Sequence, residues 1–259
     1  MEIRIEDPNN NFNLTIEKNK INGVLGTNKE ELAYKMNLGT TKNEKIWIDD
    51  KEIKLEEIHD YKEKIKIIPK EFSPLEFRYK VYELMYEEMK RIETALIDPK
   101  KKMIDSLTIV GLELDCLNQN IQDLSSSERK LLQIGMSLMS NPEVLIMIEP
   151  FKDFDLKTEK SILSLFQVMK EQYDKTIVII SDDVNMIYNY ADHLIIEKNN
   201  KIIIEGVAKE ILERVDFLQK NKIAIPEIVD FTYKARNKKV KIDFHKDIRD
   251  LIKDIYKHI

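Results

Sequence analysis

Glycine, cysteine and long apolar runs are all scarce in this chain. Six of its 259 residues are glycine, against roughly 7% in an average protein: Gly23, Gly26, Gly39, Gly111, Gly135 and Gly206. Loops that wrap a phosphate need glycine for close backbone approach, so any such loop here has few residues to use. The single cysteine, Cys116, excludes an internal disulfide and a cysteine metal cluster, and it fits a reducing cytoplasm.

Three further absences narrow the class of protein. No apolar run approaches the roughly 18 residues of a membrane helix, and the start, Met1–Glu6, does not resemble a signal peptide. The net charge of −5 excludes a nucleic-acid binder that relies on bulk positive charge. We therefore expect a soluble, cytoplasmic protein that binds no nucleic acid, with docking on the inner face of the cell membrane left open.

The clearest pattern begins at Leu124. Apolar residues at helical spacing follow Leu124-Ser125-Ser126-Ser127-Glu128 and predict a helix of about four turns. Ser125, Ser126 or Ser127 is the expected N-cap, because a serine hydroxyl accepts the free N–H groups of a first turn.

Two short apolar runs follow this helix. Val144–Ile148 and Thr176–Ile180 flank a helical segment over Lys157–Gln172, which predicts two buried parallel strands in a βαβ unit. Glu149 and Asp182 come directly after these strands, and open α/β sheets place their sites at that edge.

A second stretch lies between a predicted strand (20–24) and a helical pattern that includes Leu32. This is the context of a phosphate-binding loop of the form Gly-x-x-x-x-Gly-Lys-Ser/Thr. Gly23 and Lys29 fall in register, whereas Asn28 replaces the second glycine and Glu30 the Ser/Thr. The candidate nucleotide-binding residues are Gly23, Gly26, Thr27, Asn28, Lys29, Glu30 and Glu31.

The order of these parts resembles that of an ATP-binding cassette (ABC) ATPase. In that family a Leu-Ser-Gly-Gly-Gln signature caps a helix, a strand then ends in Asp-Glu-Pro, and a later strand ends at a histidine. The corresponding residues here are Leu124–Glu128, Ile148-Glu149-Pro150 and Asp182. The resemblance implies an α/β fold, a P-loop NTPase of ABC type with a mixed sheet, an inserted helical subdomain and a small α-rich C-terminal extension.

The resemblance also assigns roles to single residues. It implies ATP as the ligand, Glu149 as a vestigial catalytic glutamate and Asp182 at the place of the γ-phosphate-sensing histidine. The signature and dimer residues would be Leu124, Ser125, Ser126, Ser127, Glu128 and Asp155. Glu30 and Ile148 stand at the Mg²⁺ positions, and an isoleucine coordinates no metal, so we expect no metal site of the usual kind.

Glu30 suggests a specific hypothesis. The N-terminus of a helix attracts an anion, so the Glu30 carboxylate would partly replace a phosphate and satisfy the loop without nucleotide. The alternative is an ordinary acidic first turn, which the helix dipole also favours. Lys70 or Pro69 stands where the family has a Mg²⁺-contacting glutamine, and a solvated Lys70 is the favoured interpretation.

We expect three parts. Residues 1–73 and 141–213 form the nucleotide-binding core, 74–140 the helical subdomain, and 214–259 the extension. The core would hold strands at 3–5, 13–16, 46–48 and 65–68 and a hairpin of 193–198 with 201–205, ended by Gly206. The extension resembles the tail of energy-coupling factor transporter ATPases, which implies a role in subunit association.

The sequence thus predicts an ABC transporter ATP-binding subunit with impaired hydrolysis at its own site. It would pair with itself or with another ATPase subunit and couple to a membrane transporter. Two alternatives remain: a pseudo-ATPase scaffold that binds no nucleotide, and an active ATPase in which Glu30 or Asp182 holds the metal. A DNA-repair ABC ATPase is disfavoured because the chain has no long coiled-coil insertion.

Overall fold

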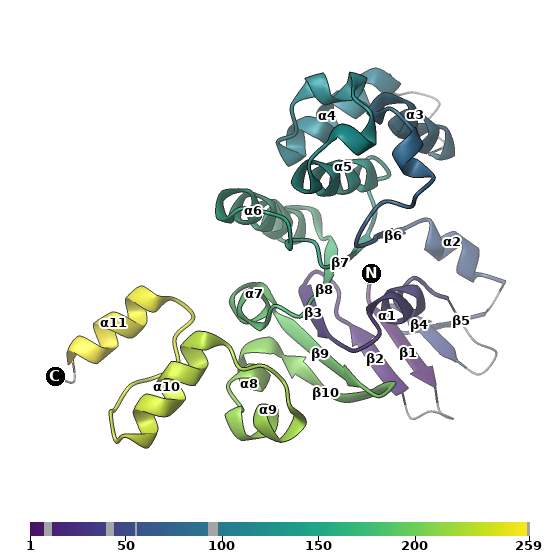
Figure 1. The fold of residues 1–259 in the computed structure, drawn as a ribbon. Coiled ribbons are helices and arrows are strands. Elements are labelled where there is room, and N and C mark those ends of the chain that lie inside the picture. The colour runs from purple at the N-terminus through teal and green to yellow at the C-terminus, as the bar shows by residue number, and fades with distance from the viewer. Residues whose placement is uncertain (8–11, 40–43, 55, 93–97, 258–259) are drawn as a thin grey trace.

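The computed structural model describes residues 1–7, 12–39, 44–54, 56–92 and 98–257. It contains a six-stranded and a four-stranded sheet, a group of helices above them, and a helical C-terminal segment to one side (Figure 1). The predicted α/β architecture with a mixed sheet is confirmed.

The six-stranded sheet positions the candidate site. Its spatial order is β10 (Lys201–Val207), β9 (His193–Lys198), β3 (Ile21–Leu25), β8 (Thr176–Ile180), β7 (Val144–Ile148) and β6 (Ile65–Ile68). The pairs from β9 through β6 are parallel and β10 is antiparallel to β9. Strands β3, β7 and β8 are buried along their whole length, as the apolar runs of β7 and β8 predict for central parallel strands.

The β9–β10 hairpin turns at Asn199 and Asn200. Both have a left-handed backbone (φ +54° and +59°), which asparagine tolerates better than most residues. One detail of the prediction is wrong. Gly206 does not end the hairpin, because β10 continues through it to Val207 and Gly206 pairs with Leu194 of β9.

The smaller sheet is antiparallel and borders a second part of the core. Its order is β2 (Phe12–Ile16), β1 (Ile3–Asp7), β4 (Lys45–Ile48) and β5 (Lys51–Ile53). The short strand β5 was not predicted, because Lys51-Glu52-Ile53 carries little apolar signal. Helix α1 (Lys29–Met36) lies between the two sheets and buries the three residues Leu32, Ala33 and Met36.

The remaining helices of the core follow the strands of the larger sheet. They are α2 (Ile58–Lys62), α6 (Leu156–Tyr173), α7 (Val184–Tyr190) and α8 (Ala208–Leu212). Helix α6 includes the predicted segment and is ended by Asp174 in a left-handed conformation (φ +54°).

The helical group comprises α3 (Val81–Arg91), α4 (Pro99–Val110) and α5 (Ser126–Leu138), with short 3₁₀ helices at Glu76–Arg78, Leu114–Asn118 and Ile121–Asp123. Residues 93–97 of the predicted helical region lie outside the described residues. Figure 1 shows these helices packed together above the sheets. Their apolar stripes form one cluster with the core, which the buried Met85, Leu107 and Leu132 exemplify.

The C-terminal segment consists of α9 (Val215–Asn221), α10 (Glu227–Asn237) and α11 (Ile248–Lys257). Helix α9 was not predicted as a separate element. Helix α11 lies beside α10 at the edge of the molecule (Figure 1), and its apolar residues Ile248 and Ile252 are exposed. No helix in the described part of the chain is long and apolar enough to cross a membrane.

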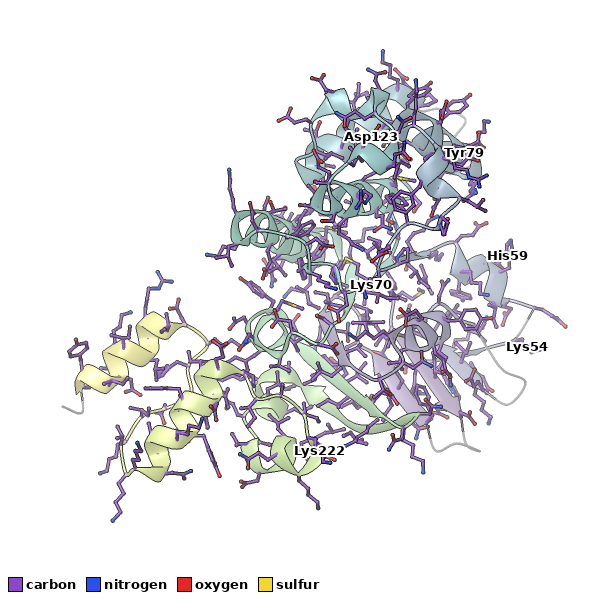
Figure 2. All side chains as sticks on the ribbon, viewed as in Figure 1. Lys54, His59, Lys70, Tyr79, Asp123 and Lys222 are labelled. Atoms are coloured by element: carbon purple, nitrogen blue, oxygen red, sulfur yellow. The ribbon has the colours of Figure 1, made fainter. Side chains whose placement is uncertain are left out.

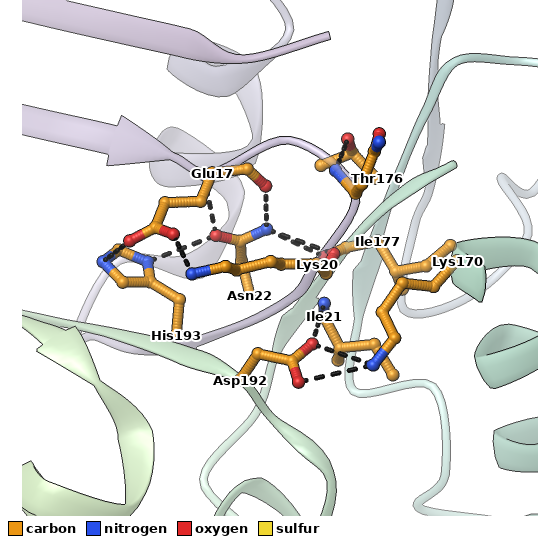
Figure 3. A network of polar contacts seen from close by, with 10 residues as sticks. Glu17, Lys20, Ile21, Asn22, Lys170, Thr176, Ile177, Asp192 and His193 are labelled. Carbon is orange, nitrogen blue, oxygen red and sulfur yellow. Dashed lines mark hydrogen bonds and ion pairs between the residues drawn. The ribbon is translucent and has the colours of Figure 1, made fainter. Parts of the chain in front are cut away.

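A polar network lies at the amino ends of β3, β8 and β9 (Figure 3). The Asn22 side chain accepts the Glu17 N–H (2.9 Å), and His193 Nδ1 lies 3.2 Å from Asn22 Oδ1. Burial lowers the pKa of His193, although Glu17 opposes that shift. The opposite, carboxyl edge of these strands carries the candidate site.

Candidate functional site

Strands β7 and β8 bring Glu149 and Asp182 together, as the sequence predicts. Glu149 follows β7 with a left-handed backbone (φ +46°), a conformation that costs free energy in a non-glycine residue. Its N–H donates to the Ile180 carbonyl (2.9 Å), and its carboxylate accepts the Ser181 hydroxyl (2.9 Å) and the Asp182 N–H (3.0 Å). These bonds from the neighbouring strand hold the Glu149 carboxylate at the sheet edge.

Lys29 completes this cluster from the first position of α1. Its ammonium group donates to Glu149 Oε1 and to Asp182 Oδ2 (2.6 Å). Burial lowers the pKa of Lys29, but the bonds to Asp182 and Glu149 outweigh burial and raise the pKa above its usual value. The lysine is therefore charged at neutral pH, and two carboxylates already neutralise that charge.

The loop before Lys29 is shorter than the motif requires. Gly23 was predicted to open the loop, but it lies inside β3, where it pairs with Ile179 and Leu194. A Cβ atom at Gly23 would lie 2.8 Å from Ile187 Cγ2, so this glycine serves close packing of β3 against α7. Only residues 26–28 connect β3 to α1.

Asn28 and Thr27 use their polar groups within the chain. Asn28 is the N-cap of α1, and its side-chain oxygen accepts the Glu31 N–H (3.4 Å) while its amide donates to Glu31 Oε2 (2.5 Å). The Thr27 N–H donates to Glu197 Oε2 (2.8 Å), and so does the Thr27 hydroxyl (3.0 Å). The polar groups of Thr27 and the side chain of Asn28 are thus engaged by side chains of this chain.

Glu30 does not act as the hypothesis required. Its side chain is exposed, and the structure gives it no hydrogen bond or ion pair with any described residue. The carboxylates that engage Lys29 are those of Glu149 and Asp182. The ordinary acidic first turn therefore describes Glu30, because a charged side chain at an exposed helix start is best solvated in water.

The residues present do not fit a Mg²⁺ ion of the kind the family uses. Ile148, at the expected ligand position, is 3% exposed within β7, and Glu30 faces solvent. Mg²⁺ requires an octahedral set of oxygen ligands, and Glu149 and Asp182 are bound to Lys29. The described residues contain no group of three His, Cys, Asp or Glu that could hold a metal.

The signature segment forms a self-contained cap. Ser125 is the N-cap of α5, and its N–H and hydroxyl both donate to Glu128 Oε2 (2.8 and 2.7 Å). The Glu128 N–H returns a bond to the Ser125 hydroxyl (3.2 Å), which completes a capping box. Bonds from the Ser125 backbone and side chain lower the pKa of Glu128. Ser126 and Ser127 form the first turn of α5, and the buried Leu124 precedes it.

Asp155 has a similar local role at the start of α6. Its carboxylate accepts the Thr158 N–H (2.7 Å), and that bond lowers the pKa of Asp155. The Asp155 side chain is exposed to solvent.

Sequence reasoning missed two residues. Glu197 follows Ile195 and Ile196 inside β9, and a carboxylate in a buried apolar run was the available signal. Lys130 of α5 is 3% exposed and donates to the carbonyls of Pro69 and Lys70 (both 2.7 Å). Lys130 thereby links α5 to the segment after β6. The Lys70 side chain in that segment (Figure 2) is exposed, which agrees with the interpretation of Lys70 as a solvated lysine.

A family model described as "ABC transporter" matches residues 9–152. The energy-coupling factor transporter ATP-binding protein EcfA2 of Clostridium perfringens is 24% identical over 247 residues, which cover 88% of this chain and 83% of that protein. EcfA2 of Enterococcus faecalis is 28% identical over 134 residues, 52% of this chain and 45% of that protein.

Solved structures agree with the fold. The cbiO1 protein of Clostridium perfringens, described as part of the ABC transporter complex cbiONQ, superposes with a TM-score of 0.68 at 22% identity and covers 89% of this chain and 98% of that one. A nucleotide-free ATP-binding cassette gives 0.66 at 20% identity, covering 86% and 97%.

The fold and the order of its motifs define a P-loop NTPase of the ATP-binding cassette type. The chain belongs to the ABC transporter family, as its sequence resemblance indicates.

Proposed function

We propose that this chain is an ABC transporter ATP-binding subunit whose own site hydrolyses ATP poorly. It pairs with a second ATPase subunit and couples to a membrane transporter of the energy-coupling factor type. The carrying observation is the engagement of Lys29 by Glu149 and Asp182. The energy-coupling factor class rests on the names of the relatives and on the C-terminal extension.

The electrostatics of the cluster oppose a triphosphate. ATP binding would require Lys29 to leave two carboxylates that it neutralises, and would then place a polyanion beside both. Two like charges at ~4 Å repel by about 4 kcal/mol at an effective dielectric near 20. Without a metal ligand at Ile148, charge developing on a γ-phosphate also lacks its usual stabiliser.

The shortened loop supports the same proposal. Phosphate-binding loops place several backbone N–H groups around the phosphates, which requires the full motif length. Here three residues connect β3 to α1, and Thr27 already donates to Glu197. We therefore expect poor hydrolysis at this site because the loop is short as well as because of the charges of Glu149 and Asp182.

The second ATPase subunit would own the working site. In that arrangement this chain contributes the start of α5, whose free N–H groups favour an anion, and Asp155 at the start of α6. Coupling to a membrane transporter would place the pair in the cytoplasm, against the inner face of the cell membrane. The C-terminal segment, with its exposed apolar residues on α11, is the part we assign to association.

A pseudo-ATPase scaffold is the second candidate, and one observation favours it. The Glu128 carboxylate accepts hydrogen bonds from the N–H and from the hydroxyl of Ser125. An internal anion therefore already occupies the start of α5. A chain whose phosphate-facing groups are satisfied internally needs no nucleotide to keep its fold. Its function would then rest on contacts with other subunits.

Steady-state ATP hydrolysis tests the proposal. The purified chain with ATP and Mg²⁺ should show background turnover, unchanged in Lys29→Ala. Paired with the ATPase subunit that co-purifies with it, Ser125→Ala in this chain should lower the turnover of the pair by about a hundredfold. The matched control Ser137→Ala, near the other end of α5, should not.

Two outcomes would contradict the proposal. Metal-dependent turnover of the purified chain that Glu149→Gln abolishes would identify an active ATPase with altered ligands. A pair whose turnover ignores Ser125→Ala, together with no calorimetric ATP binding by this chain at millimolar nucleotide, would favour the scaffold.

A further inference from the structure

Glu197 is a buried glutamate, and proteins seldom bury a carboxylate. The residue is 4% exposed near the end of β9, after two apolar residues. Strand β9 pairs in parallel with β3, and Ile196 faces Leu25 in register. Glu197, the next residue of β9, and Gly26, the residue that follows β3, therefore lie side by side at the sheet edge that carries the candidate site.

The contacts of Glu197 account for its burial. Oε2 accepts the Thr27 N–H (2.8 Å) and the Thr27 hydroxyl (3.0 Å), and Oε1 accepts the Asn200 N–H (2.5 Å). A buried charge is costly unless hydrogen bonds compensate it, and bonds to an ionised acceptor are the strong ones. Three donors from two loops converge on this one carboxylate.

Gly26 makes this approach possible. A Cβ atom at Gly26 would lie 3.0 Å from Glu197 Oε2 and 2.5 Å from Leu32 Cδ1. The loop therefore has a glycine where the Glu197 carboxylate approaches its backbone. Phosphate-binding loops use glycine for the same reason, with a phosphate oxygen in the place of the carboxylate.

We propose that Glu197 is a permanent internal anion that holds the loop of residues 26–28 and excludes phosphate from it. The inference rests on the proposed function, in which this chain's own site is impaired, and it adds a second device to the first. Glu149 and Asp182 neutralise the Lys29 ammonium, whereas Glu197 engages a backbone N–H of the loop. The two devices use different atoms and act separately.

Pyrophosphate binding to Glu197→Gln tests the proposal, because glutamine keeps the size of the side chain and removes its charge. By calorimetry without Mg²⁺, the wild-type chain should bind pyrophosphate only weakly, with a dissociation constant above about 1 mM. Glu197→Gln should raise the association constant by at least about tenfold, since the repulsion of one nearby carboxylate is removed.

Glu205→Gln is the matched control. Glu205 accepts the Thr15 N–H and the Thr15 hydroxyl (both 3.1 Å), which repeats the chemistry of Glu197 and Thr27 away from the loop. This variant should bind pyrophosphate no better than the wild type. A gain of equal size in both variants would overturn the proposal, because it would reflect net charge and not the position of Glu197.

Amide hydrogen exchange on the unaltered chain covers the case in which Glu197→Gln fails to fold. The Thr27 and Asn200 amides should be protected, and exchange as fast as that of an open loop would overturn the proposal. A folded Glu197→Gln chain without gained affinity would do the same and leave the proposed function standing. ATP turnover by the wild-type chain would instead contradict the proposed function.

Discussion

Two carboxylates stabilise the charged form of Lys29. Burial lowers the pKa of Lys29, but the bonds to Asp182 and Glu149 outweigh burial and raise it, so the pairing contributes stability below pH 10.5 and that contribution is lost as the pH rises through the folded-state pKa. Glu197 and Glu128 occur in comparable positions, each accepting an N–H and a hydroxyl from one residue. At the scale of residues, internal carboxylates accept the N–H and hydroxyl groups of Thr27 in the loop and of Ser125 at the start of α5.

Gly23 provides a prediction at this scale. Gly23→Ala should lower the free energy of unfolding by about 1–3 kcal/mol, because its Cβ would overlap Ile187 in a buried strand. Urea denaturation measures the loss.

The double variant Gly23→Ala with Ile187→Ala is the control, and it should lose less stability than the two single losses added together. A glycine that served a phosphate loop would behave differently. Its substitution would change nucleotide binding and leave the unfolding free energy near the wild-type value, which would contradict the packing role.

At the scale of the secondary-structure elements, Lys130 links α5 to the segment that follows β6. Lys130 donates to the carbonyls of Pro69 and Lys70, which follow β6. Burial lowers the pKa of Lys130 to about 8, with Asp153 and Glu71 opposing that shift. Two acceptors match the two N–H groups of a neutral amine, so the link persists after deprotonation.

This link predicts a pH dependence. The folded pKa of Lys130 is about 8 and the ordinary value is 10.5, so between these values the unfolded chain binds the additional proton. Stability attributable to Lys130 should therefore rise with pH in that window, by about 3 kcal/mol in total.

Urea denaturation of the wild type and of Lys130→Met from pH 7 to 10.5 measures this rise. The difference in unfolding free energy between the two proteins should grow with pH. Lys100→Met, at an exposed position of α4, is the control and should follow the wild type. A pH-independent difference between wild type and Lys130→Met would refute the assignment.

At the scale of the whole molecule, the C-terminal helix α11 leaves apolar residues exposed. Ile248 is 65% exposed and Ile252 44%, whereas Leu251 of the same helix is 4% exposed. One face of α11 thus packs against the chain, and its other apolar residues meet solvent. We assign this exposed face to subunit association.

Sedimentation velocity tests that assignment. The double variant Ile248→Asp, Ile252→Asp should weaken self-association or pairing by at least about tenfold, and its unfolding free energy should stay within about 0.5 kcal/mol of the wild type because the changes are on the surface. Leu251→Asp is the contrasting variant and should destabilise the fold by burying an unpaired charge. Unchanged association in the double variant would rule out this face.

Much of the fold was predictable because local patterns determine it. The apolar runs of β7 and β8, the serine cap of α5 and the Asn-Asn turn of the hairpin all depend on residues a few positions apart. Strand β5 and helix α9 were missed, since their short sequences carry weak periodicity and form by packing against neighbours.

The sequence by itself determined the family, the order of the elements and the meeting of Glu149 with Asp182, because parallel strands end at one edge. Only the tertiary structure decided how the site is filled. Strand pairing places Gly23 within β3 and so shortens the loop, and the β3–β9 register brings Glu197 to Thr27. These contacts join residues some 170 positions apart, and no local pattern encodes which distant carboxylate will reach a given N–H.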